Sequence, residues 1–225
     1  HIVTGKAENK FGIALQDMLE VVELAEQLPN ISFWGLHFHI GSQITDMLDY
    51  VALCQRINEI QDLLNQHGIY PSMINVGGGL GVDYQAPDEH PIADFRAYFQ
   101  VFEQQLHLRS GQSLHFELGR SVVAQCGSLI TRVLYVKQAM TKQFVIVDAG
   151  MTELLRPALY QAKHTIQNLS APSNTNCIRY DVVGPICESS DVFDKDILLP
   201  VTQRGDILAI RTAGAYGESM ASTYN

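Results

Sequence analysis

Basic residues are scarce in this sequence. Lysine and arginine together number 15, against 24 aspartates and glutamates, so the formal net charge is −9. Nucleic acids and anionic membrane surfaces attract proteins with an excess of positive charge. We therefore expect neither nucleic acid nor a membrane surface as the main partner of this chain.

Cysteine is also scarce, and the cysteines are far apart. No Cys-x-x-Cys pair predicts a zinc site or a redox motif, so we expect no metal. Reduced thiols in a cytoplasmic protein are the simplest interpretation. The four cysteines are Cys54, Cys126, Cys177 and Cys187.

Long apolar runs are missing as well. None approaches the roughly 20 residues that a membrane-spanning helix requires, and the first residues do not form a cleavable signal. With 46% hydrophobic and 17% charged residues, the composition is typical of a globular protein. The chain begins at His1 without a methionine, so we expect it to be part of a longer protein.

The first half of the chain alternates helical and strand periodicities. Residues 18–28 carry apolar side chains on one helical face, and residues 31–40 then switch to period two. Repeated strand and helix units of this length imply a parallel sheet, in either a barrel or a doubly wound fold. The remaining helices and strands of this half are predicted at 51–64, 73–76, 92–106 and 114–118.

The rhythm changes from about residue 126. Strand patterns follow one another without long helices between them, which predicts a second, mostly β domain with a boundary near residues 120–130. The predicted strands are 129–136, 144–147, 178–183 and 207–210.

Three consecutive glycines, Gly77 to Gly79, come directly after a predicted strand. Without side chains, their N–H groups can approach and cradle a phosphate. A tight turn is the alternative. The triplet is neither the glycine pattern of a dinucleotide site nor a P-loop.

Polar groups follow two other predicted strands. His37 and His39 end one strand shortly before Ser42, and Glu117 and Arg120 end another. In a β/α barrel the C-terminal strand ends form the site, so a ring there can pack on a planar ligand and a hydroxyl can hold a phosphate. Structural histidines and an internal Glu117–Arg120 salt bridge are the alternatives.

The second half adds a thiol, a cation and several further polar groups. Cys187 and Glu188 lie in a polar loop after an apolar strand, so the thiol is expected to be accessible rather than part of the core. Arg156, Tyr160 and Tyr216 suit the binding of carboxylates and phosphates. A surface arginine and packed tyrosines are the alternative interpretation.

Taken together and in this order, these segments resemble the alanine-racemase-like, fold type III pyridoxal-phosphate-dependent decarboxylases. Within that family they are most similar to the branch that acts on diaminopimelate. The matching stretches span essentially the whole chain. They are 4–5, 9–13, 37–43, 75–81, 117–121, 148–151, 156–160, 183–191, 205–217, 220–222 and 224–225.

The resemblance implies pyridoxal 5′-phosphate as the cofactor. His39 would stack on its ring, and Glu117 would keep the pyridine nitrogen protonated, which makes the ring a better electron sink. The residues that would surround its phosphate are Ser42, Gly78, Gly79, Arg120 and Tyr216.

The resemblance also implies catalytic and substrate-binding roles. Cys187 would return a proton as general acid. Arg156 and Tyr160 would hold the distal carboxylate of the substrate, and Glu188 its ammonium group. The site would be shared across a homodimer interface, with Cys187 and Glu188 serving the partner. The complete implied substrate-binding set is Arg120, Arg156, Tyr160, Glu188 and Tyr216.

The implied fold is α/β. Residues 1–125 would form the C-terminal part of a (β/α)₈ barrel, and residues 126–225 a β-sheet domain, with truncation of its C-terminal end left open. The family carries its cofactor-binding lysine on an early barrel strand, which is expected to be missing here, and Lys10 does not replace it. Leu118 stands where the family has proline, which changes local stiffness rather than chemistry.

The implied activity is decarboxylation of meso-2,6-diaminopimelate to L-lysine and CO₂ by the complete enzyme, with these 225 residues inactive alone. One alternative is a decarboxylase for another amino acid or for a polyamine precursor such as carboxynorspermidine. Arg156 discriminates between them, because a distal carboxylate requires a cation. A second alternative is a non-catalytic homologue, for which a proton donor such as Cys187 has no use.

Overall fold

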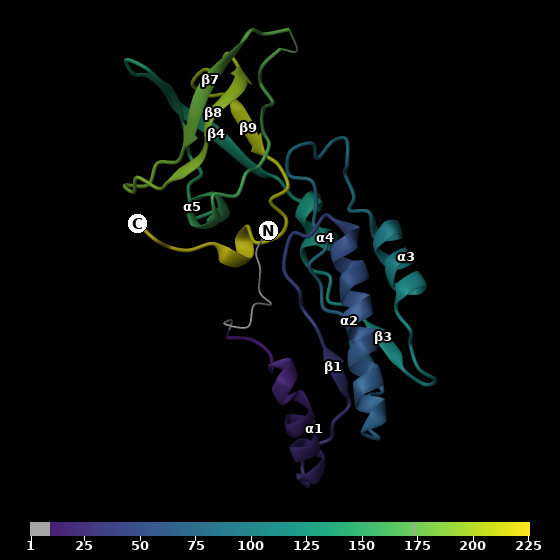
Figure 1. Ribbon diagram of the computed structural model, residues 1–225. Coiled ribbons are helices and arrows are strands. Elements are labelled where there is room, and N and C mark those ends of the chain that lie inside the picture. Colours follow the sequence, from purple (N-terminus) through teal and green to yellow (C-terminus); the bar gives the residue numbers. More distant parts are fainter. Residues whose placement is uncertain (1–9, 173) are drawn as a thin grey trace. The chain divides into compact units, whose positions relative to one another are not determined.

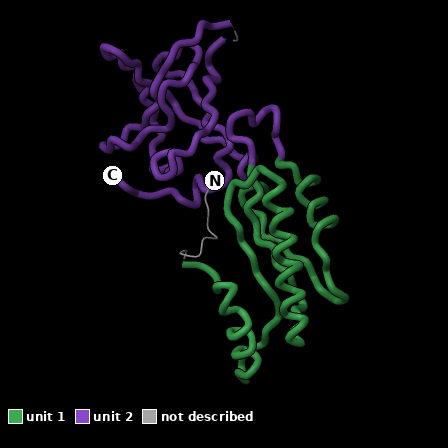
Figure 2. The backbone as a smooth tube through the Cα atoms, viewed as in Figure 1, with its two compact units in different colours: residues 1–81, 93–121 green, residues 82–92, 122–225 purple. Residues whose placement is uncertain are grey.

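The computed structural model describes residues 10–172 and 174–225, so the family-like residues 4–5 and 9 lie outside the described part. The chain forms two compact units (Figure 2). The first unit holds the residues up to 81 together with 93–121, and the second holds 82–92 together with 122–225. Both units contain helices and strands, so the fold is mixed α/β.

A sheet of three short parallel strands forms the centre of the first unit, in the order β1-β2-β3 (Figure 1). The predicted parallel arrangement is therefore confirmed. The strand predicted at 31–40 is shorter than expected. Only three of its residues pair with β2, because β2 itself ends shortly before the glycine turn at 77–79. The strands are β1 (Gly35–His37), β2 (Met73–Asn75) and β3 (Ser113–His115).

Three amphipathic helices accompany this sheet. The carboxylate of Asp46 caps the second helix by accepting from the Leu48 amide at 2.9 Å, and that of Asp94 caps the third at the Ala97 amide. Ile92, predicted inside the third helix, therefore lies before its start. The helices are α1 (Met18–Gln27), α2 (Met47–Gln66) and α3 (Phe95–Gln105), with η1 (Leu15–Asp17) before α1 and α4 (Arg120–Val123) after β3.

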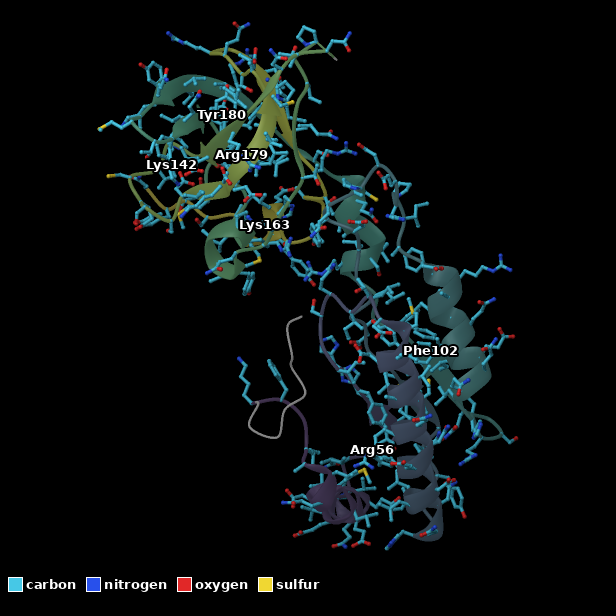
Figure 3. The ribbon with its side chains drawn as sticks, turned by 45° about the horizontal axis from the view of Figure 1, so that its top comes forward. Arg56, Phe102, Lys142, Lys163, Arg179 and Tyr180 are labelled. Atoms are coloured by element: carbon cyan, nitrogen blue, oxygen red, sulfur yellow. The ribbon has the colours of Figure 1, made fainter. Side chains whose placement is uncertain are left out.

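The apolar stripes of these helices form the core of the first unit. Met18 and Val22 of α1 pack with Ile60 and Leu64 of α2. Burial of each such side chain contributes about 1.5–3 kcal/mol. A second cluster is aromatic and joins α2 to α3, with Phe102 (labelled in Figure 3) among its members. Its rings are Tyr50, Tyr98, Phe99, Phe102 and Phe116.

The second unit is built on a six-stranded mixed sheet in the order β6-β9-β4-β5-β7-β8. Figure 1 labels β4, β7, β8 and β9 of this sheet. The expected dominance of β structure is confirmed. Short helical segments lie between the strands: η2 (Ala124–Cys126), α5 (Arg156–Tyr160) and η3 (Glu218–Met220). The strands are β4 (Leu129–Gln138), β5 (Gln143–Val147), β6 (Ile166–Asn168), β7 (Cys177–Val183), β8 (Val192–Pro200) and β9 (Ile207–Ile210).

Two strands of this sheet were not predicted from the sequence. β6 is only three residues long, which is too short for a clear alternation. β8 contains the charged run Asp194 to Asp196, and Asp196 adopts a left-handed backbone at φ 55°. The register between β7 and β8 shifts in this region, so the period of two is broken.

Residues 82–92, placed in the first domain by the sequence prediction, group with the second unit. The Thr165 hydroxyl donates to the backbone carbonyl of Tyr84 at 2.8 Å, and the Arg211 guanidinium donates to Asp88 at 2.8 Å. These bonds fasten the segment to the residue before β6 and to the residue after β9. Among the described helices, none is long and apolar enough to cross a membrane.

Two buried tyrosines, Tyr50 and Tyr180, make a matched test of this packing. The Tyr180 oxygen accepts from the Thr202 amide at 3.1 Å, whereas the Tyr50 hydroxyl has no hydrogen-bond partner among the described residues. We expect Tyr180→Phe to lower the free energy of unfolding of the complete protein by about 1–3 kcal/mol, because it leaves a buried N–H unpaired. Tyr50→Phe should change it little. Urea unfolding measures both, and equal losses would contradict this account.

Candidate active site

The three parallel strands of the first unit end at one edge of their sheet. The backbone register aligns His37 of β1 with Asn75 of β2, and Asn75 with His115 of β3. Because side chains alternate along a strand, these three residues lie in one row on one face. Leu36, Ile74 and Leu114 occupy the opposite face by the same alternation. The face that carries His37 is therefore polar on all three strands.

Glu117 lies two residues after β3 and is held by that row. Its Oε1 accepts from Nδ2 of Asn75 at 2.9 Å, and its Oε2 lies 3.2 Å from Nε2 of His37. More than half of each side chain of the His37–Glu117 pair is exposed, at 54% and 57%. Solvent therefore weakens the pair, which still orients the carboxylate. The sequence suggested for His37 only a ring that could pack on a planar ligand, and it suggested no role for Asn75, although both lie inside the matching stretches.

Arg120 and Ser42 place a cation beside a hydroxyl. Nη2 of Arg120 donates to Oγ of Ser42 at 2.9 Å, across 78 residues of sequence. The arginine is 7% exposed and is the first residue of α4. Ser42 follows Gly41 and precedes Gln43, which has a left-handed backbone at φ 61°. The pair is a ready donor set for an anion.

The glycine turn after β2 has no room for side chains. A Cβ at Gly77 would lie 2.2 Å from the carbonyl oxygen of Phe38, and one at Gly78 would lie 2.2 Å from that of Glu117. A Cβ at Gly79 would lie 2.4 Å from the carbonyl oxygen of Gly41. The turn thus packs directly against the ends of both neighbouring strands, which is the steric role of a tight turn.

The same turn also presents backbone donors. The amide of Gly77 donates to Oδ1 of Asn75 at 2.9 Å, but the amides of Gly78 and Gly79 have no acceptor among the described residues. His39 lies beside the turn, with its Nδ1 3.2 Å from the position of a Cβ at Gly77, and its side chain is exposed. Phosphate cradle and tight turn are therefore compatible functions of one segment.

The second unit holds the remaining candidate residues. Arg156 is only 6% exposed, so the alternative of a surface arginine is wrong. Its Nη1 lies 2.9 Å from Nε2 of His164, and its guanidinium lies over the ring of Tyr84 at 4.7 Å. Tyr160 ends the same short helix, α5, and is half-exposed.

The loop that carries Cys187 and Glu188 is exposed, as predicted for the thiol. A buried carboxylate fixes the base of this loop. Oδ1 of Asp191 accepts from the Met151 amide at 2.6 Å, and its Oδ2 accepts from the Ile186 amide at 2.8 Å. Burial raises the pKa of the Asp191 carboxyl, and the charge of Glu153 adds to this effect.

Glycine at position 184 makes room for that carboxylate, since a Cβ there would lie 2.3 Å from Oδ2 of Asp191. A glycine placed ahead of the aspartate was the signal in the sequence for this role, but no role was predicted for Asp191. Ser189 and Ser190 of the loop and Pro157 of α5 line one cavity of about 410 Å³. The Cys187 loop and the Arg156 helix are therefore neighbours within the second unit.

Tyr216 lies in the left-handed region at φ 58° and is partly exposed. Gly214 and Gly217 flank it, and a Cβ on Gly217 would lie 2.5 Å from the carbonyl oxygen of Ala213. This turn therefore has a fixed course.

Within the described ranges, no group of three or more His, Cys, Asp or Glu side chains could hold a metal ion.

Comparison with known proteins places this geometry in a family. Residues 42–214 match the family model described as pyridoxal-dependent decarboxylase, C-terminal sheet domain. The chain is 59% identical over 225 residues to diaminopimelate decarboxylase of Bacteroides thetaiotaomicron, and it covers 58% of that relative. It is 43% identical over 225 residues to diaminopimelate decarboxylase of Helicobacter pylori and covers 55% of it. The chain thus spans about half the length of the curated relatives that it matches.

Solved structures give the same result. Diaminopimelate decarboxylase from Helicobacter pylori complexed with L-lysine aligns with a TM-score of 0.84 and 41% identity, over 100% of this chain and 55% of that one. The enzyme from M. jannaschii in co-complex with L-lysine aligns with a TM-score of 0.86 and 32% identity, over 97% of this chain and 51% of that one.

The raised pKa of Asp191 gives a pH test. The folded chain binds the proton of the Asp191 carboxyl more tightly than the unfolded chain does. The contribution of this proton to the free energy of unfolding is therefore fully present at acidic pH. It is lost as pH rises from near 3.8 through the raised value. We expect the difference in free energy of unfolding between wild type and Asp191→Asn to shrink across this window, measured by urea unfolding of the complete protein.

Asp148 is the matched control with the opposite sign. The Thr131 hydroxyl and the Arg132 amide hold the pKa of its carboxyl below the ordinary value, through bonds of 2.6 and 2.8 Å. The stability difference between wild type and Asp148→Asn should therefore grow as pH rises from the lowered pKa toward 3.8. A difference that grows with pH for both variants would overturn the assignment for Asp191.

Proposed function

We propose that the complete protein decarboxylates meso-2,6-diaminopimelate to L-lysine and CO₂. The premise is that this chain belongs to the family of pyridoxal-dependent decarboxylases, whose C-terminal sheet domain it matches. The observation that supports this most strongly is the meeting of Glu117, Arg120, Ser42 and the glycine turn at one sheet edge. Relatives at up to 59% identity carry the name of this enzyme.

The residues at this edge fit pyridoxal 5′-phosphate. Its phosphate requires several donors, and the Arg120–Ser42 pair and the open amides of Gly78 and Gly79 supply them. A carboxylate keeps its pyridine nitrogen protonated, and Glu117 presents one that is held by Asn75 and His37 and is more than half exposed. When bound, the cofactor supplies an electron sink for the electron pair that stays on the substrate carbon when its bond to CO₂ breaks.

Each side chain then has a defined task. Glu117 holds a proton on the pyridine nitrogen, and Asn75 and His37 keep its carboxylate in one orientation. His39, exposed beside the glycine turn, packs on the ring. Tyr216 adds a phenol to the phosphate and substrate contacts. The cofactor-binding lysine belongs to the part of the relatives that this chain does not cover.

Cys187 returns a proton to the substrate carbon after CO₂ leaves. Its loop is exposed and anchored by Asp191, which suits a group that has to reach a reacting atom at a fixed distance. In the homodimer that we propose, Cys187 and Glu188 complete the site of the partner subunit.

The distal end of the substrate carries a carboxylate and an ammonium group. Arg156 with Tyr160 holds the first, and Glu188 holds the second. The buried cation of Arg156 favours diaminopimelate over substrates without a distal carboxylate, for which a buried cation is a cost. Two relatives were solved with L-lysine bound, which retains this distal end.

For the architecture, we propose that residues 1–125 are the C-terminal part of a (β/α)₈ barrel and that residues 126–225 are the sheet domain. Three parallel strands with helices between them support this proposal, because such a barrel is built from units of this kind. Their outer edges require further strands, because open edges pair with other chains. We expect the complete enzyme in the cytoplasm.

Cys187→Ala tests the central chemical role. In the complete protein we expect CO₂ release from meso-diaminopimelate to fall about 10²–10⁴-fold, because a general acid contributes that much. The visible absorbance of the bound cofactor should remain. Cys126→Ala is the control, since Cys126 is also an exposed free thiol. Unchanged turnover in Cys187→Ala would refute the role of the thiol, and loss of absorbance would refute its separation from cofactor binding.

A further inference from the structure

A buried histidine connects Arg156 to the backbone of the second unit. His164 is 4% exposed and lies between α5 and β6. Its Nε2 lies 2.9 Å from Nη1 of Arg156, and its Nδ1 lies 2.9 Å from the carbonyl oxygen of Arg211. Both ring nitrogens are therefore engaged.

These two contacts determine where the ring carries its proton. A guanidinium only donates hydrogen bonds, so Nε2 of His164 has to accept from Arg156. A carbonyl oxygen only accepts, so Nδ1 has to carry the proton that is donated to Arg211. The ring is consequently a neutral imidazole in one tautomer, fixed from both sides.

Tyr84 fixes the guanidinium from a second direction. The Arg156 guanidinium lies 4.7 Å from the centroid of the Tyr84 ring, and the His164 ring meets Tyr84 edge-on, with centroids 4.9 Å apart and planes at 77°. Tyr84 is itself anchored, because its carbonyl oxygen accepts from the amide and hydroxyl of Thr165 at 3.2 and 2.8 Å. One contact is a hydrogen bond at Nη1, and the other places the guanidinium over an aromatic ring.

We propose that His164 is a positioning residue, which holds the guanidinium of Arg156 in the plane required to bind the distal carboxylate of the substrate. This inference rests on the proposed function, in which Arg156 binds that carboxylate. An arginine otherwise samples many rotamers, and planar recognition of a carboxylate tolerates little rotation. A side chain held in advance loses less entropy when the substrate binds.

Two amide variants separate the functions of the two ring nitrogens. His164→Asn keeps a donor near the position of Nδ1, toward Arg211, but removes the acceptor for Arg156. His164→Gln places an amide oxygen near the position of Nε2 and keeps that acceptor. The probes are L-lysine, which carries the distal carboxylate, and 1,5-diaminopentane, which lacks it. Both are tested as inhibitors of CO₂ release by the complete enzyme.

In His164→Asn we expect inhibition by L-lysine to weaken about tenfold and KM for meso-diaminopimelate to rise by a similar factor. The kcat value should change less than KM, because distal binding is nearly equal in ground and transition states. Inhibition by 1,5-diaminopentane should not weaken. His164→Gln should recover most of the loss. Equal weakening of both inhibitors, or no recovery with glutamine, would overturn the inference.

Arg156→Met distinguishes a failure of this inference from a failure of the proposed function. If Arg156→Met leaves inhibition by L-lysine unchanged, the assigned role of the arginine is wrong. If Arg156→Met weakens it and His164→Asn does not, only the role of the histidine is wrong. In the double variant, His164→Asn should add nothing to Arg156→Met, because the histidine acts through the arginine. A further tenfold loss in the double variant would contradict that route.

Discussion

The close approach of the glycine turn to its neighbouring strand ends is the constraint on which the candidate site depends. Any side chain at Gly77 or Gly78 would overlap the backbone carbonyl of Phe38 or Glu117 at 2.2 Å. The ends of β1, β2 and β3 therefore meet closely enough for His37 and Asn75 to reach Glu117. The same geometry leaves the amides of Gly78 and Gly79 without an acceptor among the described residues.

The second unit uses a buried carboxylate for a comparable purpose. Asp191 joins the Cys187 loop to the segment after β5 by accepting from Ile186 and Met151. The thiol is thus exposed on a loop whose base is fixed. A short helix on the neighbouring wall of one cavity carries Arg156, which is buried against Tyr84 and His164. Exposed loops on rigid supports are common in active sites.

Much of this arrangement could be predicted from the sequence, because its signals are local. Apolar periodicity indicated α1, α2 and α3, and the position of three polar segments directly after strands indicated a shared edge. Contacts between distant residues could not be predicted in this way. The pairing of Asn75 with Glu117 spans 42 residues, and that of Arg120 with Ser42 spans 78.

Other errors have equally physical origins. β8 was missed because a left-handed residue, Asp196, interrupts its alternation. A surface position was an alternative for Arg156, because neither Tyr84 nor His164, which both contact it, is marked by a motif. Side chains whose partners come from other elements carry no local signal, and they are the ones that shape this site.

A crystal structure of the complete protein with pyridoxal 5′-phosphate and L-lysine tests the central claim most directly. We predict the phosphate within hydrogen-bond distance of Ser42, Arg120 and the amides of Gly78 and Gly79, and the pyridine nitrogen against the carboxylate of Glu117. A cofactor bound elsewhere, or with its ring nitrogen away from Glu117, would contradict the account.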